Sequence, residues 1–509
     1  MSLSRQSRLS SYLLPSLADT LFISLLVALA FGSPTLRLLN DPGIGWHICT
    51  GEWILQNHAV PHSDLFSNVA RPWFAWEWLF EIGVAKVHSW AGLNGVLAAG
   101  AALIALTFAL LFRLTLQRGA SLVTTVLFVV LSALASTVHC LARPHLFTWF
   151  FTLLCWYLLE VKRATVWVWA IPAIVLLWVN IHGGFLVAFA LLGLTLAGET
   201  WEIATSAPDP ARRRDFLRLA FVAIASFAAS LANPYGISLY VHIYRYLSDP
   251  FLMHHIQEMQ SPDFHTFNAM CFAALVLLAA CVAITKRHRL RISQSFVLIF
   301  FAYAALSAVR NTPIACIVLT LTAAPLLNTK DDALPRPSRL RERLRGSSQR
   351  MGALELNSRG HAWAIVFAII TVLACANGGK FLGRQLLRGE FNGKKFPLRA
   401  VAFLELHPIP GPLFTTDAWS GFIIYREWPR LRVVVDDRHD MYGAEFMKNY
   451  LKIIEGQPDW KAQLEATGAN SVLVPSTSAT STLLHLTPDW KLTYDDGQAA
   501  LFERLRGAQ

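Results

Sequence analysis

The sequence predicts a mostly α-helical, polytopic membrane protein with a small α/β domain at its C-terminus. Three observations predict this fold class: a low share of charged residues, long apolar runs, and basic residues that return in every second loop. The chain of 509 residues is 54% hydrophobic and 15% charged, whereas a soluble chain carries about a quarter charged residues. Because the apolar excess lies in long runs, it indicates membrane-spanning helices.

Eleven apolar segments are candidates for these helices. A helix needs about 20 mostly apolar residues to cross the hydrocarbon core, because every backbone amide in lipid has to be hydrogen-bonded internally. The fourth and fifth segments are shorter, so we expect them to tilt or to thin the bilayer locally. The segments lie near residues 17–39, 91–112, 120–138, 145–160, 165–180, 184–200, 216–232, 267–285, 292–309, 311–327 and 362–379.

The loops between these segments predict their orientation. Every second connection is rich in Lys and Arg, and the short loops between them hold one basic residue or none, as the positive-inside rule requires. The N-terminus is therefore expected in the cytoplasm and the C-terminal region outside. The same loops explain the net charge of +11 through attraction to anionic lipids, so no nucleic-acid partner is predicted. The basic connections are Arg113 with Arg118, Lys162 with Arg163, 212–214, 286–291 and 330–350.

Two domains follow from this topology. Residues 1–380 are expected to form the transmembrane domain, with a first outer loop at 40–91 and a flexible cytoplasmic linker at 328–361. Residues 381–509 are expected to form a periplasmic α/β domain, because their composition is that of a soluble chain with short β-prone runs. Strands are predicted at 413–416, 431–435, 471–474 and in two short runs near the end, with a helix around 445–454.

The first outer loop contains two Trp-rich stretches with helical spacing. Trp46, Cys49 and Trp53 fall on one helical face, and the residues from Trp73 to Val87 give a second such face. Helices of this kind lie along the membrane surface, where they form part of a site or only an anchor.

Unusual polar residues gather at the predicted outer ends of the helices, where they could line one cavity. Asp41 follows the first span and precedes a Pro-Gly turn, so it is either a reacting carboxylate or a helix cap. Arg143 and Arg310 lie near the outer interface, where a guanidinium either binds phosphate or extends to lipid headgroups. The other candidates are His47, Asp64, Glu77, His145, Asn180 and His182.

Structural alternatives remain open for most of these residues. His182 precedes Gly183 and Gly184 and is either a ligand or a hydrogen-bonded interfacial histidine, and Glu77 is favoured as a structural acid. A cluster of charged residues, 436–440, directly follows a predicted strand. Ligands often bind at strand ends in α/β sheets, but a solvated turn is the favoured interpretation. No histidine or acidic cluster has the spacing of a metal site. The sequence predicts no cofactor and gives no support for a divalent metal.

Several motifs resemble a group of bacterial membrane proteins placed with the GT-C glycosyltransferases, of the protein O-mannosyltransferase and aminoarabinose-transferase kind. The resemblance spans most of the chain. The motifs are Asp41-Pro-Gly-Ile-Gly-Trp-His, Gly51-Glu-Trp-Ile-Leu, Pro61-His-Ser-Asp-Leu-Phe-Ser, Trp76-Glu-Trp-Leu, Ala142-Arg-Pro-His-Leu-Phe-Thr, Trp178-Val-Asn-Ile-His-Gly-Gly, Asn233-Pro-Tyr-Gly and Val435-Asp-Asp-Arg-His-Asp-Met-Tyr-Gly.

The resemblance implies a glycosyltransferase (a hexosyl or pentosyl transferase) that takes a sugar from a polyprenyl-phosphate donor on the outer face of the bacterial inner membrane. It implies a general base in the first outer loop beside the first span, and Asp41 occupies that position, although no acidic residue adjoins it. The expected binding residues are the eight named above, with inversion at the transferred sugar. The acceptor, whether glycan, lipid or protein, is not predicted.

Two other functions stay open at this stage. A transporter usually buries ionisable groups near the bilayer midplane and shows repeated halves, and the sequence shows neither feature. A non-catalytic scaffold that binds a lipid-linked glycan in the cell envelope would keep the same fold and polar clusters.

Overall fold

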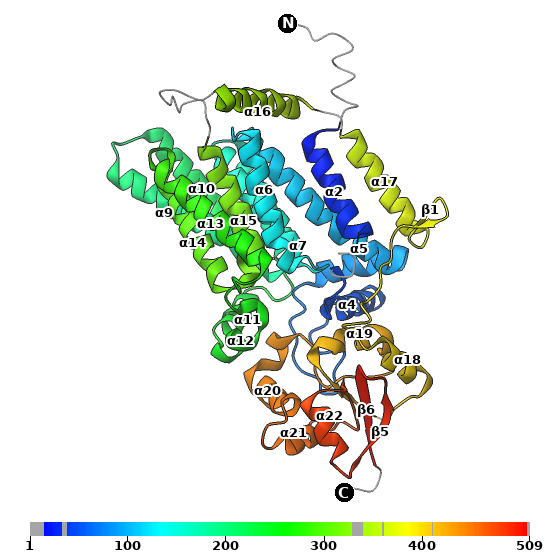
Figure 1. The fold of residues 1–509 in the computed structure, drawn as a ribbon. Helices are drawn as coiled ribbons and strands as arrows, with labels where there is room; N and C mark the ends of the chain where they lie inside the picture. Colours follow the sequence, from blue (N-terminus) through cyan, green and yellow to red (C-terminus); the bar gives the residue numbers. More distant parts are fainter. Residues whose placement is uncertain (1–14, 33–37, 328–338, 359–360, 410, 506–509) are drawn as a thin grey trace.

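The computed structural model describes residues 15–32, 38–327, 339–358, 361–409 and 411–505. The protein is mostly helical (68%) and has a small sheet near its C-terminus, which confirms the predicted fold class at that level. The helices lie side by side in a bundle, and the C-terminal sheet lies beyond one end of it (Figure 1).

Helices occupy all eleven segments that were predicted to be apolar spans. Residues 33–37 of the first segment lie outside the described residues. The helices are α2 (Leu17–Phe31), α5 (Trp78–Gln117), α6 (Leu122–Ser136), α7 (His145–Val161), α8 (Ala170–Trp178), α9 (Leu186–Thr205), α10 (Pro210–Ser230), α13 (Phe267–Thr285), α14 (Ile292–Ser307), α15 (Thr312–Leu326) and α17 (Ala362–Ala376).

Five of the described helices are long and apolar enough to cross a membrane. A sixth span is counted if α17 and the preceding helix, which meet at a bend of 59°, are taken together. The chain is therefore a multi-pass membrane protein by the length and composition of its helices, whereas eleven crossings and their direction remain a prediction.

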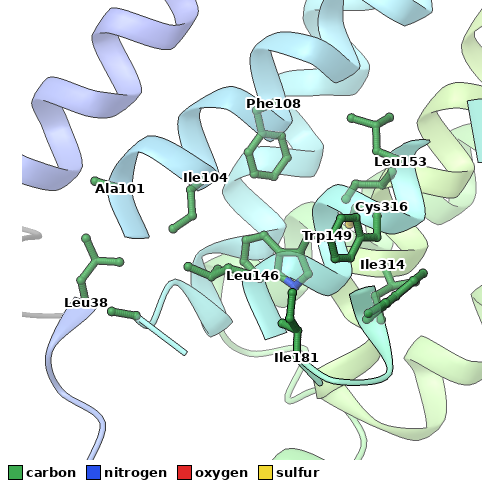
Figure 2. Packing of buried hydrophobic residues seen from close by; sticks show 14 of the residues in the cluster. Leu38, Ala101, Ile104, Phe108, Leu146, Trp149, Leu153, Ile181, Ile314 and Cys316 are labelled. Atoms are coloured by element: carbon green, nitrogen blue, oxygen red, sulfur yellow. The ribbon is translucent and has the colours of Figure 1, made fainter. Parts of the chain in front are cut away.

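Large aromatic and aliphatic side chains fill the space between the helices. Phe108 of α5, Trp149 of α7 and Cys316 of α15 meet in one continuous apolar cluster (Figure 2). One pair of hydroxyl groups in this interior joins α6 to α15: Ser132 and Thr320 share a hydrogen bond of 2.6 Å between their side-chain oxygens. Such pairing removes the cost of an unsatisfied polar group among apolar side chains.

The prediction of a flexible linker is wrong for residues 339–357, which form helix α16 (Arg339–Asn357). This helix lies across the end of the bundle opposite the C-terminal sheet (Figure 1). The Glu355 carboxylate accepts hydrogen bonds from the backbone N–H groups of Leu17 (2.6 Å) and Ala18 (3.1 Å), and Ser348 Oγ accepts one from Leu122 N. Free helix ends need such partners, so α16 is ordered by capping α2 and α6. Residues 328–338 and 359–360 lie outside the described residues.

Residues 40–91, which we predicted to be the first outer loop, form two helical pieces at one end of the bundle (Figure 1). Helix α4 (Gly43–Asn57) carries the first predicted aromatic face. The second face continues into α5, a 40-residue helix that is broken at Gly92, where φ is +58° and glycine is the residue that adopts this backbone without strain. The break separates the loop half of α5 from its apolar half.

The C-terminal region contains a four-stranded sheet in the order β3-β4-β6-β5. Strands β3 (Leu413–Thr415) and β4 (Ser471–Pro475) are parallel, whereas β4, β6 (Ala499–Arg504) and β5 (Trp490–Asp495) pair antiparallel. A short hairpin, β1 (Lys380–Phe381) with β2 (Arg384–Gln385), precedes it. The helices around the sheet are α18 (Leu398–Leu406), α19 (Asp417–Glu427), α20 (His439–Ile454), α21 (Trp460–Ala466) and α22 (Ala479–His485).

The predicted strand at residues 431–435 is wrong, since only Val433 forms isolated β-bridges there. Its N–H donates to Phe66 O (3.1 Å), and its carbonyl accepts from Asn68 N (3.2 Å), so the backbone pairs with the first outer loop in place of a full strand ladder. Helix α19 also approaches α4 closely: a Cβ on Gly45 would lie 2.0 Å from Gly421 O. The C-terminal region and the first outer loop therefore share one continuous interface.

Candidate functional site

The Arg143 guanidinium lies between two aspartates that are far apart in the sequence. Its Nε is paired with Asp41 Oδ2, and its Nη2 donates to Asp437 Oδ2 at 2.6 Å. Backbone and indole N–H groups fix the two carboxylates from the other side, from Gly43 N to Asp41 Oδ1 (3.2 Å) and from Trp46 Nε1 to Asp437 Oδ1 (2.7 Å). Three segments therefore converge here: the chain before α4, the loop before α7 and the chain before α20.

We call Asp41, Arg143 and Asp437 the Arg143 trio. The pKa values of these three residues are set mainly by burial and by their charges on one another. Burial raises the pKa of Asp437 to about 7, although Arg143 opposes the rise and the neighbouring Asp41 adds to it. Burial also raises the pKa of Asp41, again against the effect of Arg143. The guanidinium itself keeps its charge: burial would lower the pKa of Arg143, but the two aspartates outweigh it and raise that pKa above its usual range.

An apolar cavity of about 280 Å³ opens beside Arg143. Its walls come from both halves of α5, on either side of the Gly92 break, and from the start of α7. Arg143 is the one charged residue among those that line it. The site thus joins an apolar slot to a single guanidinium, which suits an amphiphilic anion.

A second polar group contains Glu77 from the chain before α5, Glu81 from the first turn of α5 and His47 from α4. The Glu77 carboxylate lies 3.6 Å from His47 Nε2, and Glu81 Oε1 lies 3.4 Å from His47 Nδ1. Burial raises the pKa of Glu77 to about 8, although Arg143 opposes the rise. The pKa of His47 is lowered well below its usual range, first by burial and then by the charge of Arg143. A protonated carboxyl and a neutral imidazole can both donate and accept hydrogen bonds from a polyol.

His182 completes this second group from the chain before α9. Gly184 N donates to His182 Nδ1 (3.1 Å), and Thr148 Oγ1 lies 2.8 Å from the same atom. Because Nδ1 accepts, the neutral ring carries its proton on Nε2, which faces Glu77 Oε1 at 3.7 Å. Burial, joined by the charge of Arg310, lowers the pKa of His182 to about 3, so the ring is neutral at physiological pH.

Arg438 is almost fully buried and joins the first outer loop to the C-terminal region. Its Nη2 contacts Asp64 Oδ1 and Asp436 Oδ2, each at 2.6 Å. The guanidinium also lies over the rings of Trp73 (4.5 Å), Phe66 (5.0 Å) and Trp46 (5.6 Å), measured to the ring centroids. We call these residues the Arg438 cluster; it lies next to the Arg143 trio, because Asp437 belongs to the trio and its two sequence neighbours belong to the cluster.

Two solved structures are similar in fold to most of the chain. One is the archaeal oligosaccharyltransferase AglB from Archaeoglobus fulgidus, with a TM-score of 0.56 and 12% identity over 90% of this chain and 69% of that one. The other is ArnT from Cupriavidus metallidurans, with a TM-score of 0.50 and 14% identity over 96% and 98%. Both proteins are GT-C glycosyltransferases. This chain has the GT-C fold. No family model and no curated protein matches its sequence.

The GT-C fold brings most of the sequence-predicted site residues to one end of the bundle. Asp41 and Arg143 contact each other, and His47, Glu77 and His182 form the second group. The other four predicted residues contact different partners: Asp64, His145, Asn180 and Arg310.

Asn180 and Asp64 have all their described polar contacts inside the protein. The Asn180 amide accepts from Trp78 Nε1 (2.8 Å) and donates to the carbonyls of Leu176 and Ala232 (2.9 and 3.0 Å), so it holds chain segments together. Asp64 belongs to the Arg438 cluster. Burial raises its pKa, but Arg438 and the hydrogen bonds from Ser67 and Phe66 N together outweigh burial and leave the pKa lowered. Neither side chain therefore offers a free group to a ligand.

His145 and Arg310 each have a near neighbour that the sequence did not suggest. His145 Nε2 donates to the backbone carbonyl of His139 at 2.8 Å. Arg310 Nη1 lies 3.4 Å from Glu258 Oε1. Burial alone would raise the pKa of Glu258, but Arg310 and Arg143 outweigh it and lower the pKa to about 2.

Sequence reasoning missed the roles of Asp437, Arg438 and Glu258. The charged run at residues 436–440 was visible, but the interpretation as a solvated turn is wrong, since Asp436 is 0% and Arg438 is 3% exposed. A buried run of charges needs partners, and acidic and aromatic residues of the first outer loop were available. Glu258, an isolated acid in a 3₁₀ turn, gave no signal. Within the described residues no group of three or more His, Cys, Asp or Glu could hold a metal ion.

Proposed function

We propose that this protein is a membrane glycosyltransferase that moves a sugar from a polyprenyl-phosphate donor to an acceptor hydroxyl on the outer face of the cytoplasmic membrane. The observation that carries the proposal is the apolar cavity that ends at Arg143. An isoprenoid tail fits an apolar slot that opens between helices, and a phosphate fits a guanidinium at its end. The AglB structure contains a dolichol-phosphate and the ArnT structure undecaprenyl phosphate, which is the same class of ligand.

In the proposed reaction, Asp41 is the general base. Its carboxylate takes the proton of the acceptor hydroxyl while that oxygen forms a bond to the anomeric carbon. The bond from this carbon to the phosphate oxygen breaks, and its electron pair stays on the lipid phosphate. Arg143 stabilises the charge that develops there. One displacement occurs, so the anomeric configuration is inverted; a retaining route would need a second nucleophilic carboxylate.

The sugar is assigned to the group of Glu77, His47 and His182. These side chains are fully or largely buried, largely neutral at physiological pH and rich in both donors and acceptors. His145 or Arg310 is proposed to help Arg143 stabilise the departing lipid phosphate. Asp64 and Asn180 act on the site only through the segments that they hold.

The proposed topology has eleven spans, with the N-terminus in the cytoplasm and the C-terminal domain in the periplasm. The presence of a helix in every predicted segment supports it. Helix α4 and the C-terminal sheet lie at the same end of the bundle, and α16, from the Arg-rich stretch, lies at the other end (Figure 1). Reaction of single introduced cysteines with an impermeant maleimide in intact cells tests this orientation.

The decisive experiment measures transfer of radiolabelled sugar from a panel of polyprenyl-phosphate donors by the purified protein. Asp41→Asn should abolish transfer while leaving donor binding, and Arg143→Gln should weaken donor binding and transfer together. Asp263→Asn, an exposed aspartate before α13, is the matched control. Transfer that is equal in wild type and Asp41→Asn would remove Asp41 from the mechanism.

A second candidate function is a scaffold that binds a lipid-linked glycan without catalysis, since the same cavity and guanidinium would serve binding alone. Binding of the donors by wild type, together with no transfer from any of them, would favour the scaffold over the transferase.

A further inference from the structure

The Arg143 trio has a charge problem if an anion is to bind there. One guanidinium and two ionised carboxylates sum to a charge of −1, and both carboxylates are largely buried, with side-chain exposures of 4% for Asp41 and 10% for Asp437. A lipid phosphodiester adds another negative charge at the same guanidinium. Uncompensated charge among buried groups is costly, so binding requires that one carboxylate move away or become neutral.

Movement of Asp437 is restrained on both sides along the chain. Asp436 accepts hydrogen bonds from Arg438 and from Tyr442 Oη (3.1 Å), and Arg438 is held within its cluster. The trio is also tightly packed: a Cβ on Gly43 would lie 2.6 Å from Arg143 Nη2 and 2.9 Å from Asp437 Oδ2. Since the flanking residues are fixed and the contact leaves no spare room, protonation of one carboxylate requires less free energy than moving it.

Within the described part of the chain, most cations near the pair already have anionic partners. Arg438 is matched by Asp64 and Asp436. His439, next in the chain, is paired with Asp417 at 3.0 Å. Further groups that act on Asp41 are Glu258, which opposes its ionisation, and Lys395, which favours it. Their effects have opposite signs, so the pair itself has to take up the charge of an incoming anion.

The Asp437 carboxylate can bind a proton near neutral pH. Burial raises the pKa of Asp437 to about 7, with Arg143 opposing the rise and Asp41 and Asp436 adding to it. Asp41 and Asp437 both contact Arg143, and each carboxylate affects the charge of the other. The two carboxyls therefore titrate as a coupled pair.

We propose that Asp41 and Asp437 form a carboxyl pair across Arg143 that takes up one proton when a lipid phosphate binds. The C-terminal domain thereby supplies the second carboxyl of the donor site. This inference rests on the proposed function, because it assumes that Arg143 receives the donor phosphate. The proton comes from solvent, and no covalent bond changes in this step.

The direction of the pH effect follows from linkage. The complex holds one proton more than the free protein, so the affinity rises as the pH falls and decreases by about tenfold per pH unit above the pKa of the free pair. Below that pKa the pair is already protonated, and the affinity becomes independent of pH.

The test is titration calorimetry with a geranylgeranyl methyl phosphodiester, a probe whose single negative charge does not change over the range used. Measurements run from about pH 6 to about pH 9, on both sides of the Asp437 pKa of about 7, in buffers of different ionisation enthalpy to count protons. Wild type should take up about one proton above neutral pH, and Asp437→Asn none, with tighter binding than wild type at the alkaline end. Asp489→Asn, on the exposed Lys461–Asp489 pair of the same domain, should behave as wild type.

Binding to wild type without proton uptake would overturn the inference and leave the proposed function standing. Retention of the full proton uptake by Asp437→Asn would also overturn it. Failure of every variant and of wild type to bind the probe at any pH would instead overturn the assignment of Arg143 as the phosphate site, and with it the proposed function. The wild-type proton count needs no substitution, so the test stands even if Asp437→Asn does not fold.

Discussion

Arg438→Ala should undo the attachment of the C-terminal domain to the first outer loop. Arg438 is the buried cation of the Arg438 cluster, with Asp64 and Asp436 as its anionic partners and side-chain exposures of 2%, 0% and 0%. Removal of the guanidinium would leave two buried carboxylates with like charge and would open a cavity among three aromatic rings. Both effects favour separation of the domain from the loop.

The magnitude follows from the geometry of the cluster. Removal of one partner from a buried ion pair costs about 3–5 kcal/mol, because the remaining charge stays desolvated. Stacking of the guanidinium on aromatic rings adds about 1–2 kcal/mol in desolvated surroundings. These two effects sum to about 4–7 kcal/mol. With about 2 °C of Tm per kcal/mol, the lower limit for a domain of this order of size, the C-terminal transition should fall by at least about 8 °C.

Two measurements test this prediction on the full-length protein in detergent. Differential scanning fluorimetry gives the Tm, and limited proteolysis should detect faster cleavage between the transmembrane and C-terminal regions. Arg426→Ala is the matched control, because Arg426 and Glu405 form an exposed pair whose side chains are 39% and 35% exposed, and such pairs contribute about 0–1 kcal/mol. Equal Tm values for Arg438→Ala, the control and wild type would refute the reasoning, since the cluster would then contribute no stability.

Two further substitutions test contacts outside the charged groups. Gly45→Ala should push α4 away from α19 and lower the Tm of the C-terminal transition, because the added Cβ would lie 2.0 Å from Gly421 O. Gly83→Ala is the control, since open space surrounds its Cβ. An unchanged Tm for Gly45→Ala would contradict the observed packing. Glu355→Ala removes the acceptor for two N–H groups of α2 and should lower the stability of that helix end by about 1–2 kcal/mol. Amide hydrogen exchange at the start of α2 should therefore become faster. Unchanged exchange would show that α16 does not cap α2.

Hydropathy predicted the helices well because lipid leaves the backbone little choice. Every one of the eleven apolar segments is helical, and the prediction needed no tertiary information. Arg143 and Asp41 could also be singled out from the sequence, because charged residues that adjoin long apolar segments stand out in such a chain. The same reasoning failed at α16, where Glu355 accepts hydrogen bonds from the start of α2, 338 residues away in the chain.

Pairings between distant segments could not be predicted from the sequence. Asp64 meets Arg438 across 374 residues, and Asp437 meets Arg143 across 294. A local charge run such as 436–440 is normally solvated, and only the acids and aromatic rings of the first outer loop make its burial tolerable. For the same reason Val433 forms its hydrogen bonds with the loop, and β-propensity alone misassigned its segment.

These pairings change which part of the chain should be regarded as the site. Asp41, the proposed base, lies in the membrane domain, but the guanidinium that it pairs with is shared with Asp437 from the chain before α20. The adjacent Arg438 binds Asp64 of the first outer loop, so the same three-residue stretch both completes the site and fixes the loop. A domain that only covered the cavity would not need two buried charges inside it. The C-terminal domain is therefore better understood as part of the proposed active site than as a cover over it.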